Sequence, residues 1–512
     1  MVASKGSGGT QTSVGMTLPG LLERGASDHP AVVVPGGPSA TYRQLAEHVE
    51  SLAGRLLAAG VEPGSTVSIV LGNDLSFVEC FLAVTRAGAV AAPLNPAYTT
   101  DEFRSFMEDA GARTVLLPPG ESPAAAAAEA LGVDALVASW SESGVELRRD
   151  GKRLADATAP ASPRSDDTAL FLHTSGTTSR PKGVPLSHAN LVASTANTAG
   201  TYDLTPHDVA LTVMPLFHVH GLIGVALSTL ASGGTIVLPP RFSAGAFWDV
   251  ARSHGVTWYS AVPTIHQVLA MRAEQDRAPS GILRFIRSCS SALTPALLEQ
   301  VETAFDAPVL EAYGMTEASH QIASNPLPPG ERRPGAVGPG TGVDTAVMDE
   351  AGTLLPQGAT GEVVIRGPNV MSGYQDNPEA NAASFANGWF RTGDQGVIEG
   401  GGYVRLTGRL KEIINRGGEK ISPLEVDAVL ARHPAVAEAI SFGVPDAKYG
   451  EEIHAAVVLN GPASEQDIQR FCLEHLAEFK APKVIHIAES LPRTATGKVQ
   501  RRQVAAAFAP PP

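Results

Sequence analysis

Residues 174–183 read Thr-Ser-Gly-Thr-Thr-Ser-Arg-Pro-Lys-Gly and directly follow the strand-like run Ala-Leu-Phe-Leu-His. Backbone N–H groups and hydroxyls in such a loop can converge on a phosphate chain, and Lys182 adds a positive charge. The alternative is an ordinary solvated loop, which the position between a strand and a helical pattern disfavours. The spacing of a P-loop is absent both here and at Gly497-Lys498. The residues that we expect to bind phosphate are Thr174, Ser175, Gly176, Thr177, Thr178 and Lys182.

Further motifs with chemical potential follow this loop along the chain. They are Tyr-Gly-Met-Thr-Glu at 313–317, Thr-Gly-Asp at 392–394, Gly-Arg at 408–409 and Pro-Arg-Thr-Ala-Thr-Gly-Lys at 492–498. In this order, the motifs resemble those of the adenylate-forming enzymes, which include acyl-CoA synthetases, peptide-synthetase adenylation domains and luciferases. The strand–helix pattern that precedes the motifs also fits this superfamily.

The resemblance implies that a carboxylate attacks the α-phosphate of ATP. Both reactants are anions, so the site must neutralise charge and align them. By resemblance, Glu317 holds Mg²⁺, Thr316 donates to the α-phosphate, and Lys498 reaches the oxygens that bridge phosphate and carboxylate. Taken singly, Glu317 could be a surface carboxylate and Lys498 a solvated charge; the shared order of the motifs favours the catalytic roles.

The resemblance also implies a set of nucleotide contacts. Tyr313 would stack on adenine, Asp394 would accept from the ribose hydroxyls, and Arg409 would lie on the same sugar-to-phosphate edge. Asp394 alone could instead be a turn residue. The other positions that the resemblance assigns to ATP or AMP are Ser291, Glu311 and Ala312.

A second half-reaction with CoA is implied as well. In this superfamily the C-terminal domain rotates between the two steps, and Lys411 matches the hinge position. Gly417 and Gly418 would let the thin pantetheine arm of CoA pass close to the backbone. A simple β-turn is the alternative for this Arg-Gly-Gly segment.

The acyl group is indicated by a closer resemblance, to the oxalyl-CoA synthetase branch. The segments that carry it are Ser179, Phe-His-Val-His-Gly at 217–221, Arg-Ser-Cys-Ser-Ser-Ala at 287–292, Met-Thr-Glu-Ala-Ser-His at 315–320 and Asn-Arg-Gly-Gly-Glu-Lys at 415–420. A small dianion needs donors that face its distal carboxylate, because a buried unpaired charge is very unfavourable. The candidates for such donors are His218, Ser290 and His320.

Other interpretations stay open at this point. The acid could be another short or medium carboxylate or a fatty acid, and the acyl group could be loaded onto a carrier protein in trans. The chain could also be an inactive nucleotide-binding scaffold, against which the intact Lys182, Glu317 and Lys498 argue. His218 and His220 could pair on a metal, but no third ligand stands near them in the sequence.

The elements that must position these residues follow a strand–helix alternation. Apolar runs at 66–71, 89–94 and 113–118 predict buried strands with helical patterns between them, and the same rhythm returns at 210–313. Such alternation predicts parallel sheets flanked by helices. Between about 330 and 405, Gly/Pro turns and short strands predict a smaller β-rich unit.

Local signals mark several helices. Thr41 followed by Gln44 has capping-box spacing, and Ser422-Pro423 suits the N-cap and first position of a helix. The alanine run at 124–128 predicts a surface helix.

The predicted fold class is α/β, with a large N-terminal domain of two flanked β-sheet subdomains plus a smaller β-rich unit. A small mobile C-terminal α+β domain carries the catalytic lysine. We expect a flexible tail at 1–16, the AMP-binding domain at 17–408 and the mobile domain at 409–512.

Composition limits the partners. The 512-residue chain has 38 Lys+Arg against 52 Asp+Glu, a formal net charge of −14, which argues against general binding of nucleic acid or anionic membranes. Its 3 cysteines, Cys80, Cys289 and Cys472, are too far apart to predict a disulfide framework or a zinc knuckle. With no signal peptide and no uninterrupted apolar stretch of about 18–20 residues, we expect a soluble, cytoplasmic protein. Its expected partners are a small carboxylate, ATP with Mg²⁺, and CoA.

Overall fold

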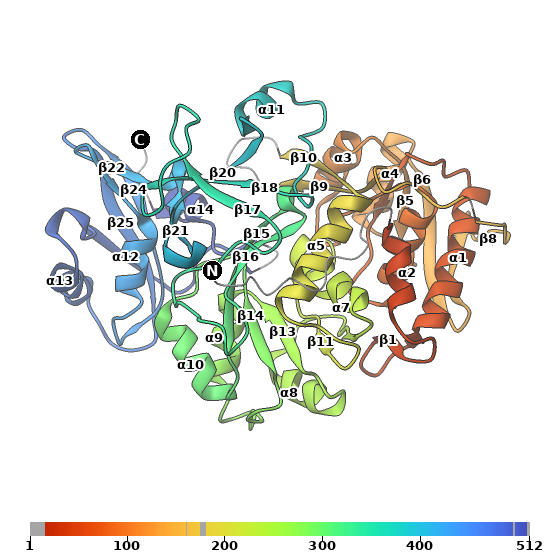
Figure 1. Ribbon diagram of the computed structural model, residues 1–512, viewed down its shortest axis with the longest axis horizontal. Helices are drawn as coiled ribbons and strands as arrows, with labels where there is room; N and C mark the ends of the chain where they lie inside the picture. Colours follow the sequence, from red (N-terminus) through yellow and green to blue (C-terminus); the bar gives the residue numbers. More distant parts are fainter. Residues whose placement is uncertain (1–15, 160, 175–180, 495–496, 509–512) are drawn as a thin grey trace, which may run out of the picture. The chain divides into compact units, whose positions relative to one another are not determined.

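The computed structural model describes residues 16–159, 161–174, 181–494 and 497–508 (Figure 1). The chain divides into two compact units, each built from several stretches of sequence. The first unit comprises Met1–Ser260, Gly314–Gln321 and Gly367–Asn381. The second comprises Ala261–Tyr313, Ile322–Arg366 and Ala382–Pro512. Within the described ranges, no helix is long and apolar enough to cross a membrane.

The first unit contains an eight-stranded sheet in the order β10-β9-β4-β3-β5-β6-β7-β8. Its inner strands run parallel, as the alternation of apolar runs predicts, while the pairs β10–β9, β6–β7 and β7–β8 are antiparallel. The strands are β3 (Thr66–Ile69), β4 (Val90–Pro93), β5 (Ala112–Leu117), β6 (Asp134–Ser141), β7 (Gly144–Arg149), β8 (Lys152–Arg153), β9 (Thr168–Thr174) and β10 (Lys182–Ser187).

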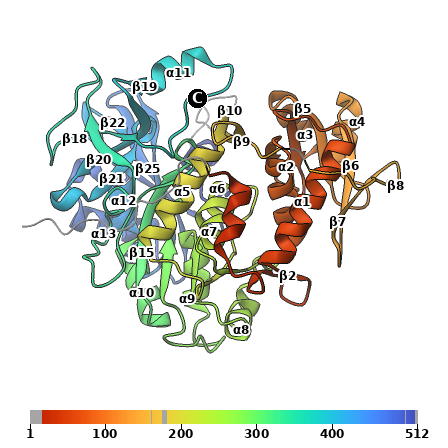
Figure 2. The same cartoon turned by 45° about the vertical axis from the view of Figure 1, so that its right-hand side comes forward.

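Four helices accompany this sheet: α1 (Tyr42–Ala58), α2 (Leu75–Arg86), α3 (Thr100–Asp109) and α4 (Pro123–Leu131). Helix α1 packs beside α2, and α3 beside α4 (Figures 1 and 2). The predicted capping box is present, since the Thr41 hydroxyl accepts from the Gln44 N–H and the Gln44 side chain accepts from the Thr41 N–H. Helix α4 is a surface helix, as the alanine run predicts: Ala126, Glu129 and Ala130 are exposed, and its other face is packed. Its small side chains fit against α3 and β5, and the fully buried ones are Ala124, Ala127 and Ala128.

A second sheet region of the first unit has the order β13-β11-β12-β1-β2. Its strands are β1 (Pro30–Val33), β2 (Ser39–Thr41), β11 (Val209–Leu211), β12 (Thr235–Val237) and β13 (Trp258–Ala261). The accompanying helices are η1 (Leu18–Arg24), α5 (His188–Thr201), α6 (Val219–Gly221), α7 (Ser228–Ala231) and α8 (Ala244–Ser253). Between α6 and α7 the backbone forms a buried π-helix, η2 (Leu222–Leu227), which packs against α5. Single-turn π segments of this kind occur frequently at functional sites.

The second unit begins with a parallel pair, β14 (Phe285–Ser288) and β15 (Val309–Met315), and two helices packed on each other, α9 (Pro263–Met271) and α10 (Pro295–Phe305). An antiparallel sheet follows in the order β17-β18-β20-β19, with β21 on β20. Its strands are β17 (Asp344–Met348), β18 (Thr360–Arg366), β19 (Phe385–Ala386), β20 (Trp389–Ile398) and β21 (Val404–Arg409). This sheet is the β-rich unit that the Gly/Pro turns predict.

The end of the chain forms a sheet in the order β23-β22-β25-β24, with β26 parallel to β25. Its strands are β22 (Ile414–Arg416), β23 (Glu419–Ile421), β24 (Val436–Asp446), β25 (Gly450–Leu459) and β26 (Val484–Ala488). Alternate residues of β25 face opposite sides, so α12 (Pro423–Leu430) and α13 (Glu465–His475) share one apolar cluster and α14 (Arg501–Phe508) another. This arrangement is the small α+β part that the sequence predicts.

Candidate active site

The predicted site residues divide between the two units. The first unit contains Thr174, Lys182, His218, Thr316, Glu317 and His320. The second contains Ser290, Ser291, Glu311, Ala312, Tyr313, Asp394, Arg409, Lys411, Gly417, Gly418 and Lys498. The expected phosphate-loop residues Ser175, Gly176, Thr177, Thr178 and Ser179 lie outside the described residues.

Thr174 and Lys182 are cross-strand neighbours at the two ends of the predicted phosphate loop. Thr174 ends β9, Lys182 begins β10, and the two are paired in the antiparallel register. The Lys182 ammonium nitrogen lies 4.5 Å from the ring centroid of Tyr374, a cation–π contact. The hairpin therefore fixes where the chain leaves and re-enters the sheet, and places one positive charge beside an aromatic ring.

Glu317 is held by the same tyrosine. It lies in the short helix η3 (Thr316–Ala318) and is 7% exposed. The Tyr374 hydroxyl donates to Glu317 Oε1 at 2.9 Å, and the Met371 N–H donates to the Glu317 carbonyl at 2.8 Å. One hydrogen bond to a single carboxylate oxygen leaves further lone pairs of Glu317 for a cation.

Glu317 presents an oxygen donor of the kind that Mg²⁺ prefers. Among the described residues, no group of three or more His, Cys, Asp or Glu side chains could hold a metal ion. Mg²⁺ commonly takes one or two protein carboxylates and completes its shell with phosphate oxygens and water. A single hard oxygen donor on Glu317 matches that pattern.

Tyr374 is a functional candidate that sequence reasoning missed. It is 57 residues from Glu317 in the chain, within a turn-rich segment whose composition gives no sign of the contact. The neighbouring Gln375 N–H donates to the Gly183 carbonyl at 3.0 Å, which ties this segment to β10. In the sequence, Tyr374 is marked only by the glycine that precedes it, and this feature does not indicate which residue the tyrosine contacts.

His320 is buried beside a second histidine in the first unit. It is 2% exposed, and its ring stacks on that of His220 with centroids 5.3 Å apart and planes 21° apart. His220 Nε2 lies 2.7 Å from Ser260 Oγ. His218 is the N-cap of α6, where its Nδ1 accepts from the His220 N–H at 3.2 Å. Two of the predicted acyl contacts, His218 and His320, are therefore linked through His220.

Gly224 leaves the space that the His320 ring fills. A Cβ on Gly224 would lie 2.3 Å from both Cδ2 and Nε2 of His320. On the backbone side, a Cβ on Gly314 would lie 2.0 Å from the His320 carbonyl oxygen. Any side chain at either position would displace His320.

Asp394, Arg409 and Tyr313 form a polar cluster in the second unit. Asp394 on β20 and Arg409 on β21 are directly paired across the two strands, and Arg409 Nε lies 2.8 Å from Asp394 Oδ1. The Tyr313 hydroxyl donates to the other carboxylate oxygen, Oδ2. Burial raises the pKa of Asp394, and the adjacent Arg409 opposes that rise. Asp394 is thus a strand residue with fixed partners, not a turn residue.

Glu311 is a buried carboxyl held by the backbone. It is 6% exposed, and the Gly335 N–H lies 3.2 Å from its Oε1 and 3.1 Å from its Oε2. Burial raises the pKa of Glu311 to about 8, against the opposing effects of the Gly335 N–H and Arg405. The side chain is therefore mostly neutral at pH 7.

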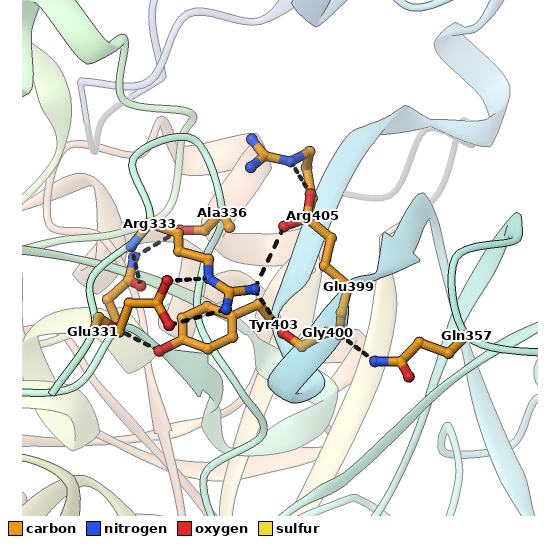
Figure 3. A network of polar contacts seen from close by, with 9 residues as sticks. Glu331, Arg333, Ala336, Gln357, Glu399, Gly400, Tyr403 and Arg405 are labelled. Atoms are coloured by element: carbon orange, nitrogen blue, oxygen red, sulfur yellow. Dashed lines mark hydrogen bonds and ion pairs between the residues drawn. The ribbon is translucent and has the colours of Figure 1, made fainter.

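The segment that donates to Glu311 is held by the polar network shown in Figure 3. The Arg333 guanidinium pairs with Glu331 at 2.9 Å and lies 3.9 Å from the ring centroid of Tyr403. Asn325 accepts from the Arg333 N–H at 3.1 Å and donates to the Ala336 carbonyl at 2.7 Å. These contacts fix the backbone on both sides of the Gly335 donor.

Lys498 is hydrogen-bonded to Thr494 near the end of the second unit. The Thr494 hydroxyl accepts from the Lys498 N–H at 3.1 Å, and the Thr494 N–H donates to the Lys498 carbonyl at 2.8 Å. Burial of the ammonium lowers the pKa of Lys498, Arg409 lowers it further, and Asp394 and Glu412 oppose the change. Lys498 as a whole residue is nevertheless exposed to solvent, and this exposure limits how far burial can lower its pKa.

The residues expected at the CoA step are exposed. Lys411 is exposed in the short helix η5 (Leu410–Glu412). Gly417 and Gly418 form the two-residue turn between β22 and β23, with φ of +60° and +94°, and the Gly417 N–H donates to the Tyr449 carbonyl at 2.7 Å. The Arg-Gly-Gly segment thus does form a turn, as the alternative interpretation holds. The backbone of this turn is exposed and therefore accessible to a ligand.

The three remaining candidates follow or lie within the parallel pair β14 and β15. Ser290 comes shortly after β14, is half-buried and has φ of +73°. Ser291 is exposed, whereas Ala312 is buried within β15.

Comparison with known proteins covers nearly the whole chain. Residues 22–375 match the family described as AMP-binding enzyme, and residues 425–498 match the AMP-binding enzyme C-terminal domain. An oxalate–CoA ligase of Arabidopsis thaliana is 48% identical over 506 residues, which cover 96% of this chain and 98% of that protein. An oxalate–CoA ligase of Saccharomyces cerevisiae is 43% identical, over 94% of this chain and 95% of that protein.

A solved structure supports the same relationship. The crystal structure of ATP-bound MatB from Rhodopseudomonas palustris aligns with a TM-score of 0.87 and 32% identity, over 96% of this chain and 99% of that one. The predicted fold class and the resemblance to the adenylate-forming acyl-CoA synthetases are both confirmed. With both family regions matched in order and relatives aligned almost end to end, this chain belongs to the AMP-binding enzyme family.

Proposed function

We propose that the protein is an ATP-dependent oxalate–CoA ligase. The observation that carries the proposal is the buried His320, stacked on His220, in a chain 48% identical to an oxalate–CoA ligase over 98% of that protein. Burying an aliphatic acyl chain against imidazole polar atoms would be unfavourable, whereas the same atoms can donate to a second carboxylate.

In the first step, a carboxylate oxygen of oxalate attacks the α-phosphorus of ATP, and pyrophosphate leaves. Lys182 and Thr174 bind the phosphate chain, together with the loop between them, and the Thr316 hydroxyl donates to the α-phosphate. Lys498 neutralises charge on the oxygens that join phosphate and oxalate as oxalyl-AMP forms. Glu317 would hold Mg²⁺, which when bound supplies positive charge to the phosphate oxygens.

The nucleotide is oriented by the cluster in the second unit. Asp394 accepts from the ribose hydroxyls, and its pair with Arg409 keeps the carboxylate in place. Tyr313 stacks on adenine. The positions that complete the ATP contacts in this proposal are Ser291, Glu311 and Ala312.

In the second step, the sulfur of CoA attacks the acyl carbon of oxalyl-AMP, the bond to the phosphate oxygen breaks, and AMP leaves. We assign the passage of the pantetheine arm to Gly417 and Gly418. Neither has a side chain, and their positive φ values disfavour residues that have one. Lys411 is the hinge for a mobile domain of residues 409–512, which turns relative to residues 17–408 between the steps.

Recognition of the distal carboxylate is assigned to His218, Ser290 and His320. A monocarboxylate offers these side chains no second carboxylate, so it lacks the charge-assisted hydrogen bonds that a dicarboxylate would form with them. A cytoplasmic location is part of the proposal, because free buried cysteines suit a reducing compartment; they are Cys80, Cys289 and Cys472.

The proposal is tested by pyrophosphate release from MgATP with oxalate, malonate, acetate, octanoate and palmitate, each with and without CoA. Selective release with oxalate, and oxalyl-CoA as product, is the expected result. Preference for an aliphatic acid would overturn the substrate assignment and leave the ligase class intact. Acyl transfer to a carrier protein but not to CoA would overturn the second step.

A further inference from the structure

Ser319 and His320 adopt a backbone conformation that their surroundings must enforce. Their φ values are +50° and +101°, in the left-handed region that residues with a side chain rarely adopt. They are 0% and 2% exposed, and in this conformation the His320 ring lies against Gly224. Such strain persists only where neighbouring groups over-determine the conformation, and it concentrates at functional sites.

Asn369 holds the chain on both sides of this strained pair. Its Nδ2 donates to the Ala318 carbonyl at 2.8 Å and to the Gln321 carbonyl at 3.1 Å. These are the residues immediately before Ser319 and immediately after His320. Because one buried nitrogen bonds both carbonyls, they must converge, and the two residues between them must form a turn.

Helix α5 supplies the contact in the middle. The Ser194 hydroxyl donates to the Ser319 carbonyl at 2.6 Å, and both residues are fully buried. Asn190, four residues earlier and on the same face of the helix, donates to the carbonyls on either side of Asn369 at 2.8 and 3.2 Å. One face of α5 therefore contacts the strained turn directly, through Ser194. Through Asn190, the same face holds the backbone on both sides of Asn369, whose side-chain amide bonds the turn.

We propose that Ser194 and Asn369 are positioning residues for recognition of the acid, which hold His320 so that its imidazole can meet the distal carboxylate. The inference rests on the role proposed above for His320. Neither residue needs to touch the substrate, because each acts through the backbone of residues 318–321. Loss of either contact lets His320 relax out of the space beside Gly224 and weakens dicarboxylate binding.

The experiment compares Ser194→Ala with Thr195→Val in the full-length protein. Thr195 is the neighbouring residue on α5 and is equally buried, and its hydroxyl donates within the helix, to the Val192 carbonyl at 2.9 Å. Ser194→Ala is expected to raise the KM for oxalate about tenfold with the KM for ATP unchanged, as loss of one buried hydrogen bond implies. Thr195→Val is expected to leave both constants unchanged, and Ser194→Thr to restore most of the oxalate affinity.

A double-mutant cycle separates positioning from general destabilisation. If Ser194 acts through His320, Ser194→Ala has no further effect on the KM for the acid once His320 is alanine. Equal losses in both backgrounds, or a parallel rise in the KM for ATP, would overturn the proposal. Asn369→Ala is a second variant for the same double-mutant cycle, and its thermal unfolding midpoint is measured as well. The outcomes that support or overturn the proposal are the same as for Ser194→Ala.

Failure of the proposed function is distinguishable from failure of this inference. If the unmodified protein activates a different acid, oxalate recognition is wrong, and the cycle is run with the acid that it does accept. Coupling between Ser194 and His320 in that cycle supports the positioning role, and additivity overturns it.

Discussion

The hydroxyl of Tyr374 donates to Glu317 Oε1 at 2.9 Å, and the ring of the same tyrosine lies 4.5 Å from the Lys182 ammonium. One side chain thereby contacts both the carboxylate assigned to Mg²⁺ and the lysine assigned to phosphate. Because a phenol is neutral, it orients these groups without cancelling either charge. The proposed function therefore gives Tyr374 a supporting part in the adenylation step.

Tyr374→Phe keeps the ring under Lys182 and removes the donor to Glu317. We expect the rate of adenylation to fall about tenfold and the Mg²⁺ concentration for half-maximal activity to rise, since one hydrogen bond to a charged group is lost. Pyrophosphate release across a Mg²⁺ titration measures both. Tyr403→Phe is the matched control, because its hydroxyl donates to the Glu331 carbonyl instead. An unchanged Mg²⁺ dependence in Tyr374→Phe would contradict the assignment.

Gly224→Ala places a methyl group where the His320 ring lies. With a clearance of only 2.3 Å, the ring must move, and kcat/KM for oxalate should fall tenfold or more while the KM for ATP stays the same. Gly200→Ala on α5 is the control, because nothing lies within 4 Å of its added Cβ. That variant should keep full activity and gain about 0.5–1 kcal/mol of stability. Full oxalate activity in Gly224→Ala would show that the placement of His320 is not needed.

Glu311→Gln should change how stability depends on pH. The folded-state pKa of Glu311 is raised from 4.5 to about 8, so the folded protein holds this proton more tightly than the unfolded chain. Its stabilising contribution is full below about pH 4.5 and is lost as pH rises through 8, with a slope on the order of 1 kcal/mol per pH unit in between.

Urea unfolding of both proteins between pH 6 and about 9 checks this dependence. The amide introduced by Glu311→Gln mimics the neutral carboxyl, so the variant should gain on the unmodified protein as pH rises. The exposed Glu350 provides the control substitution, Glu350→Gln. Parallel stability profiles for Glu311→Gln and the unmodified protein would contradict the assigned proton.

Lys498→Ala should separate the two half-reactions. Adenylation is expected to fall at least about 100-fold, because a positive charge at the developing bond is removed, whereas thioester formation from supplied oxalyl-AMP and CoA should persist. The pKa of Lys498 is lowered, so its charge is lost earlier than that of an ordinary lysine as pH rises. Lys498→Arg should therefore extend adenylation to higher pH. Unchanged adenylation in Lys498→Ala would favour a non-catalytic role.

The fold and the ordered motifs could be predicted because their signals are local. The apolar run of β3 and the capping box at Thr41 each lie within a few residues, and the structure contains both. Asp394 and Arg409 sit in short motifs whose order identifies the family, and the β20–β21 register then brings them together.

The contacts that support the site could not be predicted in the same way. Tyr374 and Asn369 act on residues about 50 positions earlier in the chain, and Asn369 bonds backbone carbonyls, whose positions depend on fold rather than residue type. Gly224 resembles any glycine in an apolar run until the His320 ring is placed against it.

The fit between Gly224 and His320 also constrains how substrate preference can change over evolutionary time. Removing the imidazole alone leaves an unfilled volume beside the π-helix, and unfilled core volume is destabilising. Enlarging Gly224 alone forces the imidazole into its neighbours. Either single substitution is thus less stable than the original Gly224–His320 pair, and also less stable than a pair in which both residues are replaced by ones that fit together. The two positions must therefore change almost together. Because the His320 ring occupies the space that the missing side chain of Gly224 leaves, a change of residue at one position is expected to require a change at the other.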